Sequence, residues 1–202
     1  MVRDSSAEAQ SAKAIVPVYK PFRKLRTRNT MNALMVVDVQ KAMFASGRTP
    51  HDGLAVVARI AQLLARARRS GTAVFHVQHD GGPGDEFCRG ERGFEFCDAV
   101  APLAGEPVIV KTKRSAFAGT GLENALRQVG INHIVLTGMQ TEFCVNTTLL
   151  GAVDRGFRMT VAHDGHTTLD NEILPAAKII ELHHRIWQPK MADLVPAAEI
   201  GF

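Results

Sequence analysis

Three residues with useful chemistry follow three apolar runs that lie far apart in the sequence. Asp38 lies near the end of the run ALMVVDV, Lys111 ends PVIVK, and Cys144 follows HIVLTG after the polar turn GMQT. Short apolar runs rich in β-branched residues are typical of buried strands. Because parallel strands gather their carboxyl ends at one edge of a sheet, we predict that an acid, an ammonium group and a thiol meet there.

Cys144 has the most informative position of the three. Thr141 is expected to cap the helix that follows, which puts Cys144 in the first turn of that helix. The helix dipole, the unpaired amide N–H groups and a nearby Lys111 would favour a thiolate there. Asp38 could accept the thiol proton, and the N–H groups of the GMQT turn and of Cys144 could bind an oxyanion. Together these groups are suited to attack on an acyl carbon.

The alternative for Cys144 is a structural role, since a lone cysteine is usually a small buried apolar residue. Because Asp38 and Lys111 are expected at the same edge of the sheet, a role of Cys144 as a nucleophile is favoured over a structural role. Cys88 and Cys97 lie in a polar segment without such company and are expected to be incidental thiols. Three cysteines without C-x-x-C spacing do not indicate a disulfide framework and are typical of a reducing compartment.

Alternating strand and helix patterns must position these side chains. Six strands are predicted, at residues 33–39, 72–78, 107–111, 133–138, 157–164 and 192–197. Four helices are predicted, at residues 54–71, 122–130, 141–156 and 175–187. Strands that are apolar on both faces and separated by helices form a parallel sheet covered on each side. The predicted fold class is α/β, a three-layer sandwich around a mostly parallel sheet of about six strands.

The basic charge of the chain is concentrated at its start. Residues 1–30 carry seven basic and two acidic groups, whereas the rest carries 17 basic and 18 acidic groups. We predict a basic extension at 1–31, flexible or packed on a neighbouring subunit, and one domain at 32–202. The extension is not expected to bind nucleic acid. It is also a poor signal peptide, and no apolar run is long enough to span a bilayer, so a cytoplasmic protein without a membrane partner is expected.

Five motifs of the sequence resemble one known family. They are LMVVDVQ, VFHVQHD, VIVKTKRSAFAGTGLENAL, HIVLTGMQTEFCVNTT and VAHDGHTT, spread from about Ala33 to Ile200. Together they are similar to the isochorismatase-like cysteine hydrolases, which include nicotinamidases and carbamoylsarcosine amidases. The resemblance implies a catalytic triad of Asp38, Lys111 and Cys144, because the family lysine precedes SAF by three residues and is therefore not Lys113. It also implies a cis peptide at Met139–Gln140 and an oxyanion hole made by the N–H groups of Gln140 and Cys144.

Two departures from the wider family narrow the activity that the resemblance implies. Enzymes that hydrolyse the vinyl ether of isochorismate lack this cysteine, so Cys144 favours amide chemistry. Nicotinamidases hold a metal with an Asp-x-His pattern after the first strand, but here His51 has no acid two residues before it. His79 alone does not supply enough ligands. We therefore expect no metal and no cofactor.

Several other residues are candidates for secondary roles. Phe44, Phe117 and Phe143 could wall a substrate pocket or pack in the core, and His79 could contact substrate or the sheet edge. The acid Asp164 is expected to anchor a turn, and His183 and His184 to lie on the surface or at an interface. The Gly-rich loop at 81–96 is predicted to act as a lid or subunit contact that sets specificity.

The sequence as a whole predicts a hydrolase that cleaves a C–N bond of a small amide through a thioester on Cys144. Isochorismatase-type ether hydrolysis is one alternative, and a catalytically silent binding or partner subunit with the same fold is another. Family members are commonly dimers or tetramers, so the resemblance implies a homo-oligomer. The identity of the amide does not follow from the sequence.

Overall fold

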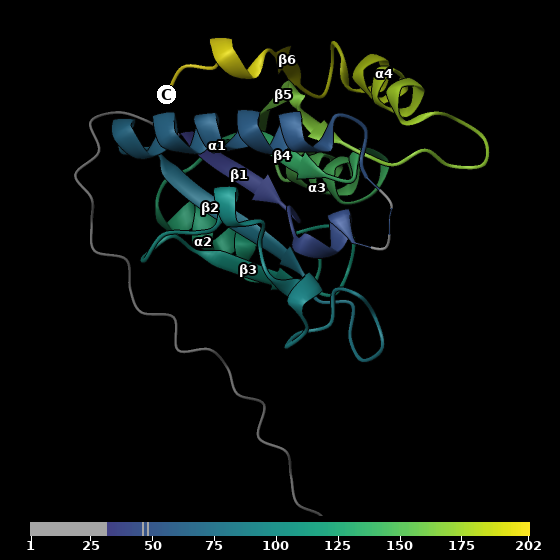
Figure 1. The fold of residues 1–202 in the computed structure, drawn as a ribbon. Coiled ribbons are helices and arrows are strands. Elements are labelled where there is room, and N and C mark those ends of the chain that lie inside the picture. Colours follow the sequence, from purple (N-terminus) through teal and green to yellow (C-terminus); the bar gives the residue numbers. More distant parts are fainter. Residues whose placement is uncertain (1–31, 46, 48) are drawn as a thin grey trace, which may run out of the picture.

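One parallel sheet organises the described part of the chain, which in this computed structural model comprises residues 32–45, 47 and 49–202. The predicted extension at 1–31 lies outside the described residues. The sheet consists of β1 (Asn32–Val37), β2 (Ala73–His79), β3 (Val108–Lys111), β4 (His133–Met139), β5 (Arg158–Thr167) and β6 (Asp193–Val195). The strand order is β3-β2-β1-β4-β5-β6, and all neighbouring pairs are parallel. The predicted fold class is confirmed (Figure 1).

Helices cover both faces of the sheet (Figure 1). One face carries α1 (Gly53–Ser70) and the short 3-10 turns η3 (Asp98–Val100) and η5 (Ala197–Glu199). The other face carries α2 (Leu122–Gln128), α3 (Asn146–Val153) and the end of α4 (Ala176–Trp187). These are the three layers that the alternating sequence pattern predicts.

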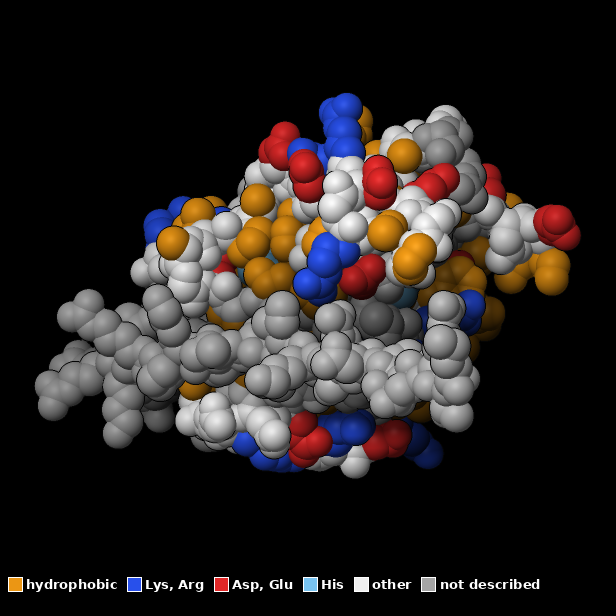
Figure 2. All heavy atoms as spheres, turned by 90° about the horizontal axis from the view of Figure 1, so that it is seen from below, with side chains coloured by type: hydrophobic (Ala, Val, Ile, Leu, Met, Phe, Trp, Pro, Cys, Tyr) orange, Lys and Arg blue, Asp and Glu red, His pale blue; other side chains and the backbone are white. Residues whose placement is uncertain are grey.

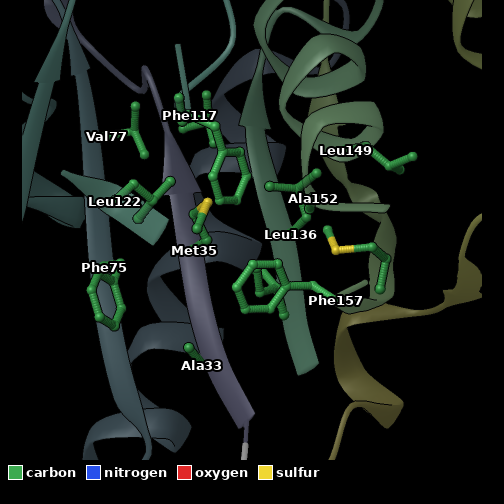
Figure 3. Close-up of a cluster of buried hydrophobic side chains, with 14 of the residues drawn as sticks. Ala33, Met35, Phe75, Val77, Phe117, Leu122, Leu136, Leu149, Ala152 and Phe157 are labelled. Carbon is green, nitrogen blue, oxygen red and sulfur yellow. The ribbon is translucent and has the colours of Figure 1, made fainter. Parts of the chain in front are cut away.

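Two apolar clusters, one on each face of the sheet, hold the layers together. Met35 faces one cluster, and its neighbours Leu34 and Val36 face the other, because successive strand residues point to opposite faces. Figure 3 shows the first cluster, where sheet side chains pack against Leu122 of α2 and Leu149 of α3. Burial on both faces explains why the strands read as continuous apolar runs.

The strand order reverses between β1 and β4. The chain runs outward from β1 to β3 and then returns to the other side of β1. In open parallel sheets, ligands bind at the carboxyl ends of the strands where the order reverses. Asp38 follows β1 directly, and Gln140 follows β4 directly. The topology therefore brings two of the predicted site segments to the position where this fold class binds ligands.

The predicted helix at 141–156 is divided in two. Thr141–Val145 forms a single π-helical turn, η4, and α3 continues from Asn146. The N–H of Val145 donates to the carbonyl of Gln140 at 3.1 Å, five residues back, which is the spacing of a π-helix. Gln140, not Thr141, is the N-cap of this turn. Cys144 thus lies in a wider turn than the sequence pattern predicts.

The surface mixes charges of both signs. In Figure 2, acidic and basic side chains lie interspersed with apolar ones on the face seen from below. Among the residues that the structure describes, no helix is long and apolar enough to cross a membrane.

Candidate active site

Asp38 forms the turn that ends β1, and its side chain is fully buried. Its φ is 51°, a left-handed conformation that Asp and Asn adopt more readily than most other non-glycine residues. Its backbone N–H donates to the carbonyl of Val77 on β2 at 3.0 Å, so the backbone of the turn is held by the neighbouring strand. The carboxylate lies beside Lys111, the last residue of β3.

Asp38, Lys111 and Cys144 lie in contact with one another. Nζ of Lys111 is 2.7 Å from Oδ2 of Asp38 and 3.3 Å from Sγ of Cys144. The side chains of Asp38 and Lys111 are fully buried, and Cys144 is 9% exposed. The structure therefore brings together the three side chains that the sequence singles out, and the lysine that reaches them is Lys111, not Lys113.

Burial and mutual charge determine the protonation of this group. Burial raises the pKa of Asp38 above its usual value, although the nearby Lys111 opposes the rise. Burial and the charge of Asp38 raise the pKa of Cys144 to about 12, and Lys111 offsets only part of this effect. The resting sulfur is therefore a thiol, not the thiolate that the sequence led us to expect. Its hydrogen bond to Asp38 directs the proton toward the carboxylate.

The segment that joins β4 to Cys144 has an unusual backbone. The Met139–Gln140 peptide is cis, as the family resemblance implies. The Thr141 side chain does not cap η4 but pairs through Oγ1 with Nδ1 of His166, at 2.9 Å. The predicted oxyanion donors, the N–H groups of Gln140 and Cys144, lie at the start of this turn and within it.

His79, at the end of β2, is held next to the buried carboxylate. Its backbone N–H and carbonyl both bond to the side-chain amide of Gln40, at 2.8 and 3.0 Å. Its ring lies 5.7 Å from that of Phe87, and its electrostatic influence lowers the pKa of Asp38. A contact between His79 and substrate remains a prediction.

The three phenylalanines predicted to wall a pocket have different surroundings. Phe143 is half-buried next to Cys144 in the chain, and the Arg114 guanidinium lies 4.2 Å from its ring centroid. Phe44 is half-buried and packs against the cluster under α1. Phe117 is buried and stacks on Phe157, both labelled in Figure 3. Core packing therefore accounts for Phe117, while roles for the other two in binding remain predictions.

The loop at 81–96 is tied to the sheet near its end. The side-chain amides of Gln78 and Gln40 donate to the carbonyl of Phe94, at 2.7 and 2.8 Å. In Figure 1 this teal segment lies at the end of the sheet to which the strand arrows point. A surface hollow of about 460 Å³ lies between the loop and η1 (Lys41–Phe44). Asp38, Lys111 and Cys144 do not line this hollow, so the role of the loop as a lid or subunit contact that sets specificity remains a prediction.

Within the described residues, no group of three or more His, Cys, Asp or Glu side chains could hold a metal ion. Cys88 and Cys97 are free thiols. Burial and the charge of Asp98 raise the pKa of Cys97, which makes its thiol less reactive.

Of the two positions expected for His183 and His184, the surface is wrong, and the interface with another subunit remains a prediction. His183 is buried, and its Nδ1 bonds to a carbonyl of its own helix at 2.8 Å. His184 is half-buried, and its Nε2 lies 2.9 Å from Nε2 of His166. Both are drawn inward because α4 packs on η4 and β5. Asp164 does anchor a turn, since its Oδ1 accepts the N–H of Ala197 at 2.7 Å.

His166 is the residue near the site that the sequence analysis missed. His166 lies on β5, and its ring contacts Thr141, which is the first residue of η4. The polar run DGHTT follows the apolar part of the fifth strand. This run could have pointed to His166, because it lies at the carboxyl end of its strand and therefore at the same edge of the sheet as Asp38.

Comparison with known proteins identifies the family of this chain. Residues 32–186 match the family model of the isochorismatase domain. The chain belongs to the isochorismatase family. Within the isochorismatase family, a streptothricin hydrolase from Streptomyces noursei is 36% identical over 168 residues, which are 83% of this chain and 56% of that protein. A maleamate amidohydrolase from Pseudomonas putida is 33% identical over 150 residues, covering 65% of this chain and 70% of that protein.

Solved structures of the isochorismatase family share the fold. The N-carbamoylsarcosine amidase of Thermoplasma acidophilum has a TM-score of 0.70 at 30% identity, covering 84% of this chain and 98% of that chain. The chain spans less than two thirds of the length of the streptothricin hydrolases that it matches, 56% and 61%. Of these three relatives, one is named as a hydrolase, one as an amidohydrolase and one as an amidase.

Proposed function

We propose that this protein is a hydrolase that cleaves a C–N bond of a small amide through a thioester on Cys144. The observation that carries the proposal is the contact of Cys144 with the buried Lys111–Asp38 pair at the switch point of the sheet. The relatives named as maleamate amidohydrolase and ureidoacrylate amidohydrolase support an amide substrate.

The first half of the reaction transfers the acyl group to sulfur. As Sγ of Cys144 bonds to the carbonyl carbon, the thiol proton passes to Asp38, whose raised pKa makes it a stronger base. The N–H groups of Gln140 and Cys144 stabilise the oxyanion. The C–N bond then breaks, and the leaving amine takes the proton from Asp38.

The second half releases the acid. Asp38 accepts a proton from water as the water oxygen bonds to the thioester carbon. The C–S bond breaks, the sulfur recovers the proton, and the carboxylic acid leaves. Lys111 remains an ammonium ion beside both partners and stabilises the negative charge that moves between oxygen and sulfur.

The setting of this reaction is part of the proposal. We infer a cytoplasmic homo-oligomer that needs no cofactor, nucleic acid or membrane. Ether hydrolysis of the isochorismatase type does not require the thiol, and a silent partner subunit requires no turnover. Each alternative therefore predicts an effect of a substitution at Cys144 that differs from the effect expected for thiol-dependent amide hydrolysis.

The test is a screen of small amides for release of ammonia or amine. Maleamate, ureidoacrylate, nicotinamide, streptothricin, carbamoyl compounds and cyclic amides are the first substrates to compare. We expect Cys144→Ala to lower kcat by roughly four to six orders of magnitude, as removal of a nucleophile does. Cys88→Ala is the matched control and should keep wild-type turnover, since this thiol pairs with the carbonyl of Arg89 and not with Lys111.

Retained amide turnover in Cys144→Ala would place the chemistry elsewhere. Hydrolysis of a vinyl ether that is unaffected by Cys144→Ala would support the isochorismatase alternative. Absence of any thiol-dependent turnover over the whole screen would favour the silent subunit.

A further inference from the structure

A chain of hydrogen bonds leads from η4 to the outer part of α4. Oγ1 of Thr141 pairs with Nδ1 of His166 at 2.9 Å, and Nε2 of His166 pairs with Nε2 of His184 at 2.9 Å. Thr141 and His166 are buried, at 0% and 2% exposure, whereas His184 is half-buried. His184 is therefore the member of the chain that is open to solvent.

The bonds of the outer histidine fix the direction of this chain. The backbone of His163 also acts on His184 and raises its pKa, as expected when a ring N–H is directed toward a carbonyl. Since Nε2 of His184 faces His166, the donor to His163 is Nδ1. Nε2 of a neutral His184 then has no proton and accepts the Nε2–H of His166. Nδ1 of His166 is left to accept the hydroxyl proton of Thr141.

Aromatic packing keeps the two rings in place. Trp187 lies edge-on to His166, with ring centroids 5.2 Å apart, and its centroid is 6.1 Å from that of His184. Its indole N–H donates to Oδ1 of Asn146, the first residue of α3, at 2.9 Å. The histidine pair is therefore locked between α4, β5 and α3, the helix that follows η4.

We propose that His166 is a positioning residue for the hydrolysis, holding Thr141 and the amide donors of η4, and that protonation of His184 switches this support off. The inference rests on the proposed function, because the amide donors are those assigned to the oxyanion. Thr141 lies between Gln140 and Cys144 in the chain, so a shift of its side chain moves both donors.

Protonation of His184 reverses the direction of the chain. Nε2 of a charged His184 carries a hydrogen, which faces the Nε2–H of His166 across 2.9 Å. His166 relieves the clash by moving its own proton to Nδ1, and Thr141 must then accept where it had donated. A buried hydroxyl whose proton has lost its acceptor destabilises this arrangement.

The surroundings of His166 and His184 favour the neutral form of both rings, in which the Thr141 hydroxyl donates to His166. Burial lowers the pKa of His166 to about 3 and that of His184 below its usual value, and His163 of β5 and His183 of α4 add to both effects. Two nearby acids on packed elements have other partners, since Asp164 pairs with Arg59, and Glu181 pairs with Lys178 and Arg185. Glu142 of η4 is half-buried, and its Oε2 has no hydrogen-bond partner.

Two substitutions test separately the positioning of η4 through Thr141 and the loss of that positioning when His184 is protonated. Thr141→Val keeps the shape of the side chain and removes the hydroxyl, and should lower kcat by roughly 10- to 100-fold with little change in KM. His184→Gln can still accept from His166 but cannot be protonated. It should keep wild-type kcat at neutral pH and retain activity at acid pH where the wild-type enzyme loses it. His51→Gln, at an exposed histidine, is the control for both.

The full-length protein is compared by kcat and KM across pH, with circular dichroism to confirm folding. Wild-type kcat in Thr141→Val would overturn the positioning role, and an unchanged acid limb in His184→Gln would overturn the switch. If no amide is hydrolysed, the proposed function fails instead. Nitrogen NMR of the imidazoles then decides the inference, since it requires a proton on Nε2 of His166 at neutral pH and on Nδ1 once His184 is charged.

Discussion

At the scale of single residues, burial of charge governs the candidate site. Asp38 and Lys111 hold opposite charges 2.7 Å apart, and both side chains are fully buried. Such a pair adds little net stability, but removal of one partner costs about 3–5 kcal/mol because the other charge stays buried and unpaired. A substitution at Asp38 therefore affects both stability and the proposed proton transfer.

We expect Asp38→Asn to lower kcat by roughly 10³-fold, since an amide cannot accept the thiol proton. We also expect it to lower the free energy of unfolding by about 3–5 kcal/mol. Steady-state kinetics and denaturant unfolding measure the two effects. Asp52→Asn is the matched control, since Asp52 has the same φ of 51° but an exposed side chain. Wild-type kcat in Asp38→Asn would mean that another group takes the proton.

At the scale of elements, the close approach of β4 to β1 brings the two halves of the site together. Gly138 pairs with Val37, and the β4–β5 register shifts between Leu136 and Gly138. Gly138 has φ 128°, and a Cβ there would lie 2.1 Å from the carbonyl oxygen of Val37. Only glycine fits this position, because both the conformation and the space exclude a side chain.

Gly138→Ala should lower the free energy of unfolding by roughly 3 kcal/mol or more, because the new methyl group meets backbone that cannot move aside. Thermal and denaturant unfolding provide the measurement. Gly121→Ala is the comparison, since Gly121 has φ −87° and open space around its Cβ position. It should change stability by less than about 1 kcal/mol. Equal effects of the two substitutions would contradict the steric argument.

The strands and layers followed from the sequence because apolar runs and helix stops are local signals. The π-helical turn of η4 did not, since Thr141 reads as an ordinary N-cap until His166, 25 residues later, takes its hydroxyl. The protonation of Cys144 was also misjudged. The helix start and Lys111 were visible in the sequence, whereas the burial that raises the thiol pKa comes from the assembled core.

At the scale of the whole molecule, buried neutral histidines make the fold sensitive to acid. Burial lowers the pKa values of His76, His133, His166 and His184. Unfolded histidines have a pKa of about 6.5, so below that pH the unfolded state binds more protons. Stability is therefore full above this pH and is lost as the pH falls. The raised pKa of Asp38 acts in the opposite direction, since acid relieves the cost of its buried charge.

The free energy of unfolding should fall between about pH 6.5 and pH 4, and His166 alone should contribute about 3 kcal/mol of the loss. Denaturant unfolding of the wild-type protein and of His166→Asn over this range measures the contribution. The variant should lose less stability on acidification. His51→Asn, at an exposed position, should follow the wild-type curve. Identical pH dependence in all three proteins would refute the assignment.

The offset charges of Lys111 and Asp38 have a consequence for substrate capture. Ammonium and carboxylate in contact form a dipole whose field decays within a short distance, and the protonated sulfur adds no charge. An uncharged amide is thus neither drawn in nor repelled by the reacting group, and dissolved ions have little to screen. We expect kcat/KM for such an amide to stay the same from low to high ionic strength; a steep dependence would reveal electrostatic steering.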